Sequence, residues 1–150
     1  QFKEGDEAAL DEAQKRGWEL FSDHCEVCHA PPLFSTYRFF NAGVGMDAEE
    51  PDKGRMEVTG EERDLGKFRV PPLREVENTA PYFHDGSVET LEEAVAMMAA
   101  GGIDNPNRSA FLKALEEAEL TEEDQADLVA FLKALSGEYP IIEPPTEFPQ

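Results

Sequence analysis

The sequence predicts an all-α fold in a single domain. Two stretches with helical hydrophobic periodicity lie near the ends of the chain, at about residues 7–21 and 121–133. Between them runs a long region punctuated by glycine and proline, and no stretch shows convincing strand alternation. The length of 150 residues fits one domain, 1–150, with a core over about 7–137. The proline-rich segment 138–150 is expected to lie extended on the surface.

A short motif follows the first helix directly and defines the expected cofactor. Cys25-Glu26-Val27-Cys28-His29 is a C-x-x-C-H run, the attachment signature of a c-type haem. Two residues between the cysteines match the separation of the two vinyl groups on one edge of the porphyrin. Each thiol can therefore form a thioether, and His29 can reach the iron. The sequence predicts one covalently bound haem c.

Two other uses of the motif are weaker. A redox dithiol expects a βαβ pattern nearby, and none is seen. A structural zinc site normally has four ligands, and only His24, His29 and His84 are available to join the two thiolates.

The elements before residue 90 follow from local patterns. In the first helix, Gly17 and Phe21 share one face, and a glycine there would allow another helix to cross closely. Residues 31–74 read as a long irregular loop whose scattered aromatic residues need a surface to pack on, which a haem face supplies. A short helical turn at residues 73–76 and a tight turn at 79–86 follow.

Three helices are expected after residue 90. Thr90 and Glu93 form a capping box that starts a helix ending near Gly101-Gly102. A second helix covers about residues 109–119. The last begins at Thr121 and ends at Gly137, with Phe131 and Leu132 in its apolar stripe. We expect Gly17 and Phe21 to meet Phe131 or Leu132 where the first and last helices cross, as in a cytochrome c fold with long loops packed around the haem.

The second axial ligand of the iron has six candidates: Met46, Met56, Met97, Met98, His24 and His84. His24 stands beside Cys25 on the proximal side, so geometry disfavours it. Met98 shares a helix face with Leu91, Ala94 and Val95, so its thioether can approach the iron while they cover the porphyrin. Periodicity therefore favours Met98, with Met97 next.

A set of ordered motifs resembles the C-terminal, high-potential haem domain of bacterial dihaem cytochrome c peroxidases and MauG-like proteins. The resemblance covers about residues 17–137, and its most specific run is Thr79-Ala80-Pro81-Tyr82-Phe83-His84-Asp85-Gly86-Ser87. The other matching runs are Cys25 to His29, Pro32 to Phe34, Asp52 to Arg55, Val58 to Gly60, Phe68 to Arg74, Thr90 to Val95 and Asp127 to Leu132.

The resemblance implies roles for particular residues. In that family the distal methionine falls fourteen residues after the histidine of the Pro-Tyr-Phe-His run, which here is Met98. His84 corresponds to a haem-pocket residue, although a hydrogen-bonded turn histidine is an equal alternative. Arg55 and Arg74 are candidates to pair with the haem propionates, or else are solvated surface charges.

This sequence departs from the family pattern by having one C-x-x-C-H run, without the peroxidatic half. Thr79 and Pro81 correspond to carbonyl ligands of a calcium ion whose remaining ligand belongs to that other half, which argues against calcium here.

The charge balance is strongly acidic. The chain carries 33 acidic and 13 basic residues, a net charge of −20. Nucleic acid is not expected as a partner, because binding phosphate needs a basic face. The acidic surface either steers a redox partner protein with a basic docking face or is a solvated surface that aids solubility. Six of the basic residues cluster and are candidates to face the haem propionates: Lys53, Arg55, Arg63, Lys67, Arg69 and Arg74.

These observations favour a monohaem c-type cytochrome that carries electrons through a six-coordinate haem. The alternative is a peroxidase, or the haem subunit of a peroxidase or MauG-like enzyme, that reduces hydrogen peroxide. No apolar stretch is long enough for a membrane span. Because covalent haem is attached outside the bacterial cytoplasm, and the chain opens like a processed one, we expect a periplasmic or otherwise exported protein. The sequence indicates no oligomeric state.

Overall fold

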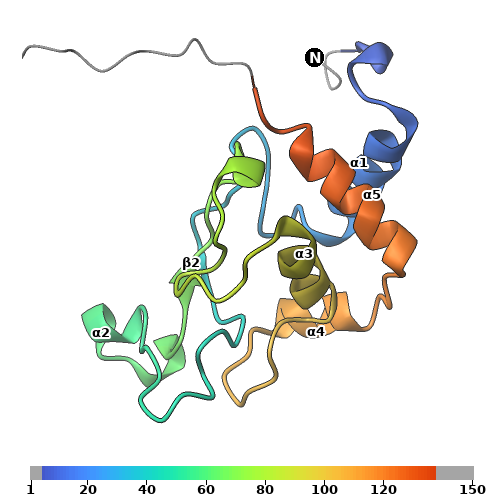
Figure 1. Cartoon of the computed structure of the whole chain (residues 1–150). Coiled ribbons are helices and arrows are strands. Elements are labelled where there is room, and N and C mark those ends of the chain that lie inside the picture. The colour runs from blue at the N-terminus through green and yellow to red at the C-terminus, as the bar shows by residue number, and fades with distance from the viewer. Residues whose placement is uncertain (1–4, 138–150) are drawn as a thin grey trace, which may run out of the picture.

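The computed structural model describes residues 5–137, and the expected extended tail lies outside them. In this range the helices are α1 (Glu12–His24), α2 (Met56–Thr59), α3 (Leu91–Ala99), α4 (Ala110–Glu116) and α5 (Glu122–Lys133). Two-residue strands, β1 (Phe39–Phe40) and β2 (Phe68–Arg69), pair in antiparallel register. Three short 3₁₀ turns complete the elements: η2 (Glu7–Ala9), η3 (Glu62–Asp64) and η4 (Val76–Asn78). The prediction of a mostly helical fold is confirmed, with one small two-stranded sheet in addition (Figure 1).

The first helix begins later than its hydrophobic pattern suggested, at Glu12 instead of about residue 7. Asp11 is the reason, because its carboxylate accepts a hydrogen bond from the Gln14 backbone at 2.9 Å. The Gln14 side chain in turn accepts from the Asp11 backbone at 3.0 Å, completing a capping box. The helix then continues through His24 and delivers the chain directly to Cys25.

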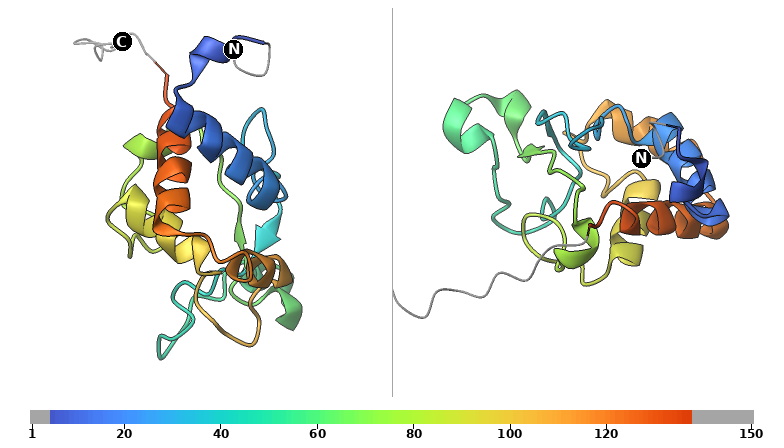
Figure 2. Two further views of the ribbon diagram at one scale, coloured as in Figure 1. Left: turned by 90° about the vertical axis from the view of Figure 1, so that its right-hand side faces the viewer. Right: turned by 90° about the horizontal axis from the view of Figure 1, so that it is seen from above.

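α1 and α5 cross in close contact, as the sequence predicted (Figures 1 and 2). Gly17 lies against the backbone of Asp127 and the Cβ atom of Phe131, where a side chain would have no room. The rings of Phe21 and Phe131 are 5.1 Å apart between centroids. Arg16 adds a two-pronged ion pair to the buried Asp127, with N–O distances of 2.6 and 2.8 Å. The crossing therefore joins the two ends of the described chain.

The long loop region holds more structure than its sequence indicated. Residues 52–67 form a small lobe containing α2 and η3, which lies to one side of the molecule (Figure 1). Buried Asp64 organises this lobe by accepting bonds from Arg55, Thr59 and Lys67 at 3.1–3.2 Å. The expected helical turn at residues 73–76 is found slightly later, as η4. Two-residue strands and single-turn helices are too short to show a periodicity, which is why the sequence did not reveal them.

The second half of the chain follows its predicted helices closely. The capping boxes of Thr90 with Glu93 and of Thr121 with Asp124 start α3 and α5. The helix expected over about residues 109–119 is shorter and is observed as α4. Lys133 of α5 bonds Glu92 of α3 at 2.9 Å and ties these helices together. Within residues 5–137, the helices are all too short or too polar to cross a bilayer.

Candidate haem site

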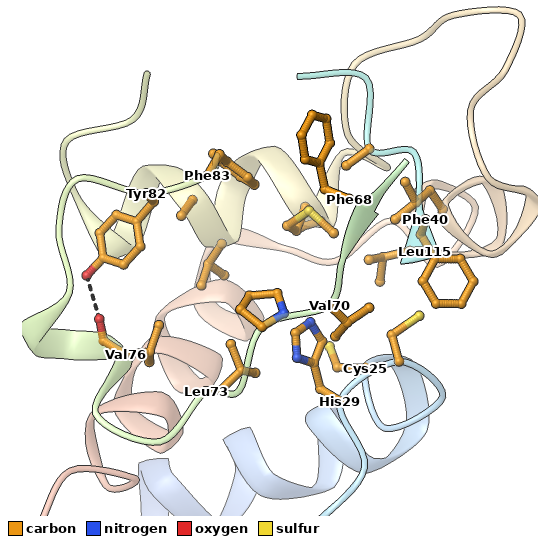
Figure 3. Close-up of a pocket in the computed structure, with 18 of the residues that line it drawn as sticks. Cys25, His29, Phe40, Phe68, Val70, Leu73, Val76, Tyr82, Phe83 and Leu115 are labelled. Carbon is orange, nitrogen blue, oxygen red and sulfur yellow. Dashed lines mark hydrogen bonds between the residues drawn. The ribbon is translucent and has the colours of Figure 1, made fainter. Parts of the chain in front are cut away.

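An apolar cavity of about 540 Å³ lies between the C-x-x-C-H turn, the loop through Val70 and Leu73, and helices α3, α4 and α5. Figure 3 shows aromatic and aliphatic side chains such as Phe40, Val70 and Leu115 turned towards it. Tyr82 also lines the cavity, and its hydroxyl donates to the carbonyl oxygen of Val76 at 3.0 Å. A flat apolar group can be buried here without leaving that hydroxyl unpaired.

Both cysteines line this cavity as free thiols. Burial, with a smaller effect of the nearby Cys28, raises the pKa of the Cys25 thiol to about 12. Burial also raises the pKa of Cys28, against a smaller lowering effect of Arg38. Redox-active dithiols depend on a lowered thiol pKa, so these shifts argue against a dithiol catalyst.

His29 lines the cavity (Figure 3), and one of its ring nitrogens is hydrogen-bonded to the backbone. Its Nδ1 lies 3.0 Å from the carbonyl oxygen of Phe34; since a carbonyl oxygen can only accept, Nδ1–H donates, and in the neutral ring Nε2 is then the unprotonated nitrogen. Burial lowers the pKa of His29, while hydrogen bonds to the backbone of Phe34 and Pro71 act in the opposite direction. The neutral ring with an unprotonated Nε2 is the form that ligates a metal.

Of the four methionines, all within the described residues, Met98 is the one that lines the cavity. It does so together with Leu91, Ala94 and Val95, as the helix face predicted. Met97 instead packs against the hydrophobic core. In Figure 3, α3 crosses the cavity on the side away from His29.

The remaining candidate residues occupy different surroundings. His84 lines the cavity from an exposed turn and stacks on Phe68, with ring centroids 3.5 Å apart. His24 lines it as well. Arg55 and Arg74 are absent from the lining. Arg55 bonds Asp64, and Arg74 donates to the Pro32 carbonyl at 3.0 Å. A propionate contact of these two arginines stays a prediction.

Sequence reasoning missed Asn41, which is fully buried beside the cavity. Its side-chain amide donates to the Leu65 carbonyl, and its oxygen accepts from Gly43 and Asn105. These bonds hold the loop that leads from Phe40 to Val44 against the segment near residue 105. An isolated asparagine in a loop carries no periodic signal, so nothing in the sequence could have selected it.

The residues present fit a covalent haem. The cavity offers two thiols, an oriented imidazole and a thioether within apolar walls. A bare metal ion fits less well, because residues 5–137 contain no group of three or more histidine, cysteine or acidic side chains placed to bind one. A porphyrin would fill the apolar volume.

Comparisons with known proteins agree with this site. The profile of the cytochrome c family matches residues 14–136. The chain is 41% identical, over 90% of its length, to the cytochrome c peroxidase Ccp of Escherichia coli (strain K12), of which it covers 28%. It is 38% identical, over 99% of its length, to the cytochrome-c peroxidase IdrP1 of Denitromonas iodatirespirans, of which it covers 46%.

A solved structure is also similar. A MauG-like protein associated with microbial copper homeostasis matches with a TM-score of 0.71 and 35% identity. The match covers 89% of this chain and 49% of that protein. This chain thus spans less than half the length of each of these relatives.

Proposed function

This chain belongs to the cytochrome c family, and we propose that it holds one haem c and passes electrons through it within a cytochrome c peroxidase system. In this proposal Cys25 and Cys28 form the two thioethers. His29 and Met98 take the two axial positions of the iron. The bound haem supplies one-electron redox chemistry, and the protein sets its environment.

The observation that carries the proposal is the position of Met98, which lines the same cavity as His29. Histidine and methionine together fill both axial positions and raise the reduction potential relative to two nitrogen ligands. An iron held in this way has no open position for peroxide. We therefore place peroxide reduction at a second site outside residues 1–150, with this chain as the source of electrons.

The names of the relatives support the peroxidase context, since both proteins compared above are cytochrome c peroxidases. A second candidate is an electron carrier that serves other acceptors. It is favoured because the described residues build a single cavity with a C-x-x-C-H motif. The two candidates share the same haem site and differ in whether its electrons reach peroxide.

The site is tested with Met98→Ala, using Met97→Ala as the matched control on the same helix. The ferric protein is expected to show the weak far-red absorption band of sulfur bound to iron. Met98→Ala should abolish this band. Because cyanide then no longer competes with the thioether for the axial position, it should bind at least about tenfold tighter, which is about 1.4 kcal/mol of binding free energy. Met97→Ala should keep both properties of the unsubstituted protein. A band that survives in Met98→Ala would contradict the assignment.

The function is tested with the natively purified protein that contains this chain, supplied with a reduced donor and hydrogen peroxide. Sustained peroxide reduction that is lost in Met98→Ala would support the peroxidase system. Rapid electron exchange without peroxide reduction would select the independent carrier. Peroxide turnover by residues 1–150 alone, with Met98 bound to iron, would overturn both.

We also propose an exported location for the protein. The reason is the covalent haem itself, whose attachment in bacteria takes place outside the cytoplasm. Fractionation of the native host, followed by haem staining, is expected to find the protein outside the cytoplasmic fraction.

A further inference from the structure

A second, shallower groove of about 390 Å³ adjoins the haem cavity. The two share Phe40, Ser109 and Phe111 as lining residues, so these residues form the border between the groove and the cavity. β1, the segment after η3 and the start of α4 form its walls. A group that leaves the cavity past Phe40 would enter this groove.

The groove has an unusual charge for this protein. Its lining contains four cations, Arg38, Arg63, Lys67 and Arg108, and no carboxylate. The chain as a whole has only 13 basic residues and a net charge of −20. Such a concentration of cations makes the groove suited to a negatively charged group.

Within the described part of the chain, two of these cations, Arg38 and Arg63, have no close carboxylate partner. Arg108 is already satisfied by Glu116 at 2.9 Å and Asp104 at 3.4 Å, and Lys67 shares Asp64 with Arg55. Arg63 has only a 4.0 Å contact with Glu61, between two exposed side chains. None of the ion pairs among residues 5–137 involves Arg38.

Arg38 is also well placed relative to the cavity. Its guanidinium carbon lies 5.3 Å from the ring centroid of Phe40, one of the residues shared by the cavity and the groove. The proposed haem carries two carboxylates, and the cavity itself is apolar, with Arg69 as the one arginine in its lining. Burying a carboxylate without a cation or hydrogen bonds is costly, so the haem carboxylates must leave the cavity where partners are available.

We propose that this groove receives a haem carboxylate, with Arg38 as its main partner and Arg63 and Lys67 as flanking cations. Charge-assisted bonds from a guanidinium suit a carboxylate in geometry and strength. The inference rests on the proposed haem site and assigns its polar end to residues other than Arg55 and Arg74. The cations also stabilise the reduced haem relative to the oxidised haem, because oxidation adds positive charge.

The experiment uses the haem-loaded protein and its Arg38→Gln variant. Resonance Raman spectroscopy detects the propionate bending mode of the haem, which depends on hydrogen bonds to the carboxylates. We expect this mode to shift in Arg38→Gln, and the reduction potential to fall. Arg38→Lys keeps the charge and should retain more of the potential than Arg38→Gln. Lys113→Gln removes one charge from an exposed position of α4 and should leave the mode unchanged.

The double variant Arg38→Gln/Arg63→Gln gives a second measurement. An unshifted propionate mode in both Arg38→Gln and this double variant, with covalent haem confirmed by mass, would overturn the inference and leave the proposed function intact. A shift in Arg69→Gln alone would place the carboxylates at another edge of the cavity and would also overturn it. Absence of covalent haem from the unsubstituted protein would instead refute the proposed function, and this inference with it.

Discussion

At the scale of single residues, Phe34 connects the side of the cavity that holds His29 to the crossing of α1 and α5. Its backbone adopts a positive φ of 55°, which is uncommon for a residue with a side chain. The ring is buried, 5.7 Å from the ring of Phe21 and 6.1 Å from that of Phe131. Its carbonyl meanwhile accepts the bond from His29. The orientation of His29 therefore depends on aromatic packing between the helices.

Gly17→Ala should weaken this packing. An added methyl group would meet the Asp127 backbone and Phe131, so α1 and α5 would have to move apart. We expect the free energy of unfolding to fall by about 3 kcal/mol, the upper end of typical overpacking effects. Denaturant unfolding of the haem-loaded protein measures this change.

Glu19→Ala, on the exposed face of the same helix, is the control for Gly17→Ala. It should change stability by less than about 0.5 kcal/mol. Equal stabilities of the two variants would mean that the close crossing is not needed.

At the scale of elements, α3 and α5 begin with the same capping geometry but serve different purposes. Thr90 accepts from the Glu93 backbone at 3.2 Å, and Thr121 accepts from the Asp124 backbone at 3.2 Å. α3 carries Met98, whereas α5 packs against α1. Loss of either cap destabilises the first turn of its helix. Only the Thr90 cap belongs to the helix that carries Met98, the proposed distal ligand.

Thr90→Ala and Thr121→Ala should therefore separate stability from ligation. Each is expected to lower the free energy of unfolding by about 1 kcal/mol. Only Thr90→Ala should make the far-red sulfur band disappear well below the temperature of global unfolding. Thermal melts followed at that band and by circular dichroism measure both events, and early loss of the band in Thr121→Ala would refute the distinction.

The lobe of residues 52–67 depends on the ionisation of Asp64. Burial acts to raise the pKa of this carboxyl, but hydrogen bonds from Lys67, Thr59 and Arg55, together with the charge of Lys67, leave it below its ordinary value of 3.8. A folded-state pKa below the unfolded value stabilises the fold above the unfolded pKa. The contribution is lost as the pH falls through the lower, folded-state pKa.

Asp64→Asn should accordingly be destabilised at neutral pH by an amount that shrinks below about pH 4. Hydrogen exchange of the backbone amides in residues 52–67, measured against pH for both proteins, follows this difference. Glu57→Gln, at an exposed position of α2, should show no such dependence. If the difference in amide exchange between Asp64→Asn and the unsubstituted protein stays the same at low pH, the ionised carboxylate of Asp64 does not stabilise the lobe.

At the scale of the whole molecule, charge separates into a broad acidic surface and a small basic groove. A net charge of −20 should attract a basic protein over long distances. We expect electron transfer from a basic cytochrome c to slow steeply between low and physiological ionic strength, because salt screens this attraction. Stopped-flow absorption measures the rate.

An uncharged small reductant is the control for this salt dependence, and its rate should stay nearly constant. A flat profile with the basic cytochrome would mean that the acidic surface serves solubility and does not steer a partner.

Much of the fold was predictable because its helices carry strong local signals. The capping boxes of α3 and α5 and the small residue at the helix crossing are readable from a few neighbouring side chains. The start of α1 was misplaced because the apolar pattern continues past Asp11, and only the capping geometry shows where the helix begins. The lobe of residues 52–67 was missed because its order comes from one buried carboxylate and its partners.

By itself, the sequence determined that a C-x-x-C-H motif follows the first helix, that Met98 shares a helix face with Leu91, Ala94 and Val95, and that the terminal helices meet. Covalent spacing and helical periodicity act over a few residues, so such features can be inferred from the order of amino acids. Only the tertiary structure decided that Met98 and His29 share one apolar cavity, that Phe34 orients the imidazole, and that Arg38 lines a basic groove beside that cavity. These relations join residues far apart along the chain, and their geometry depends on how the whole chain packs.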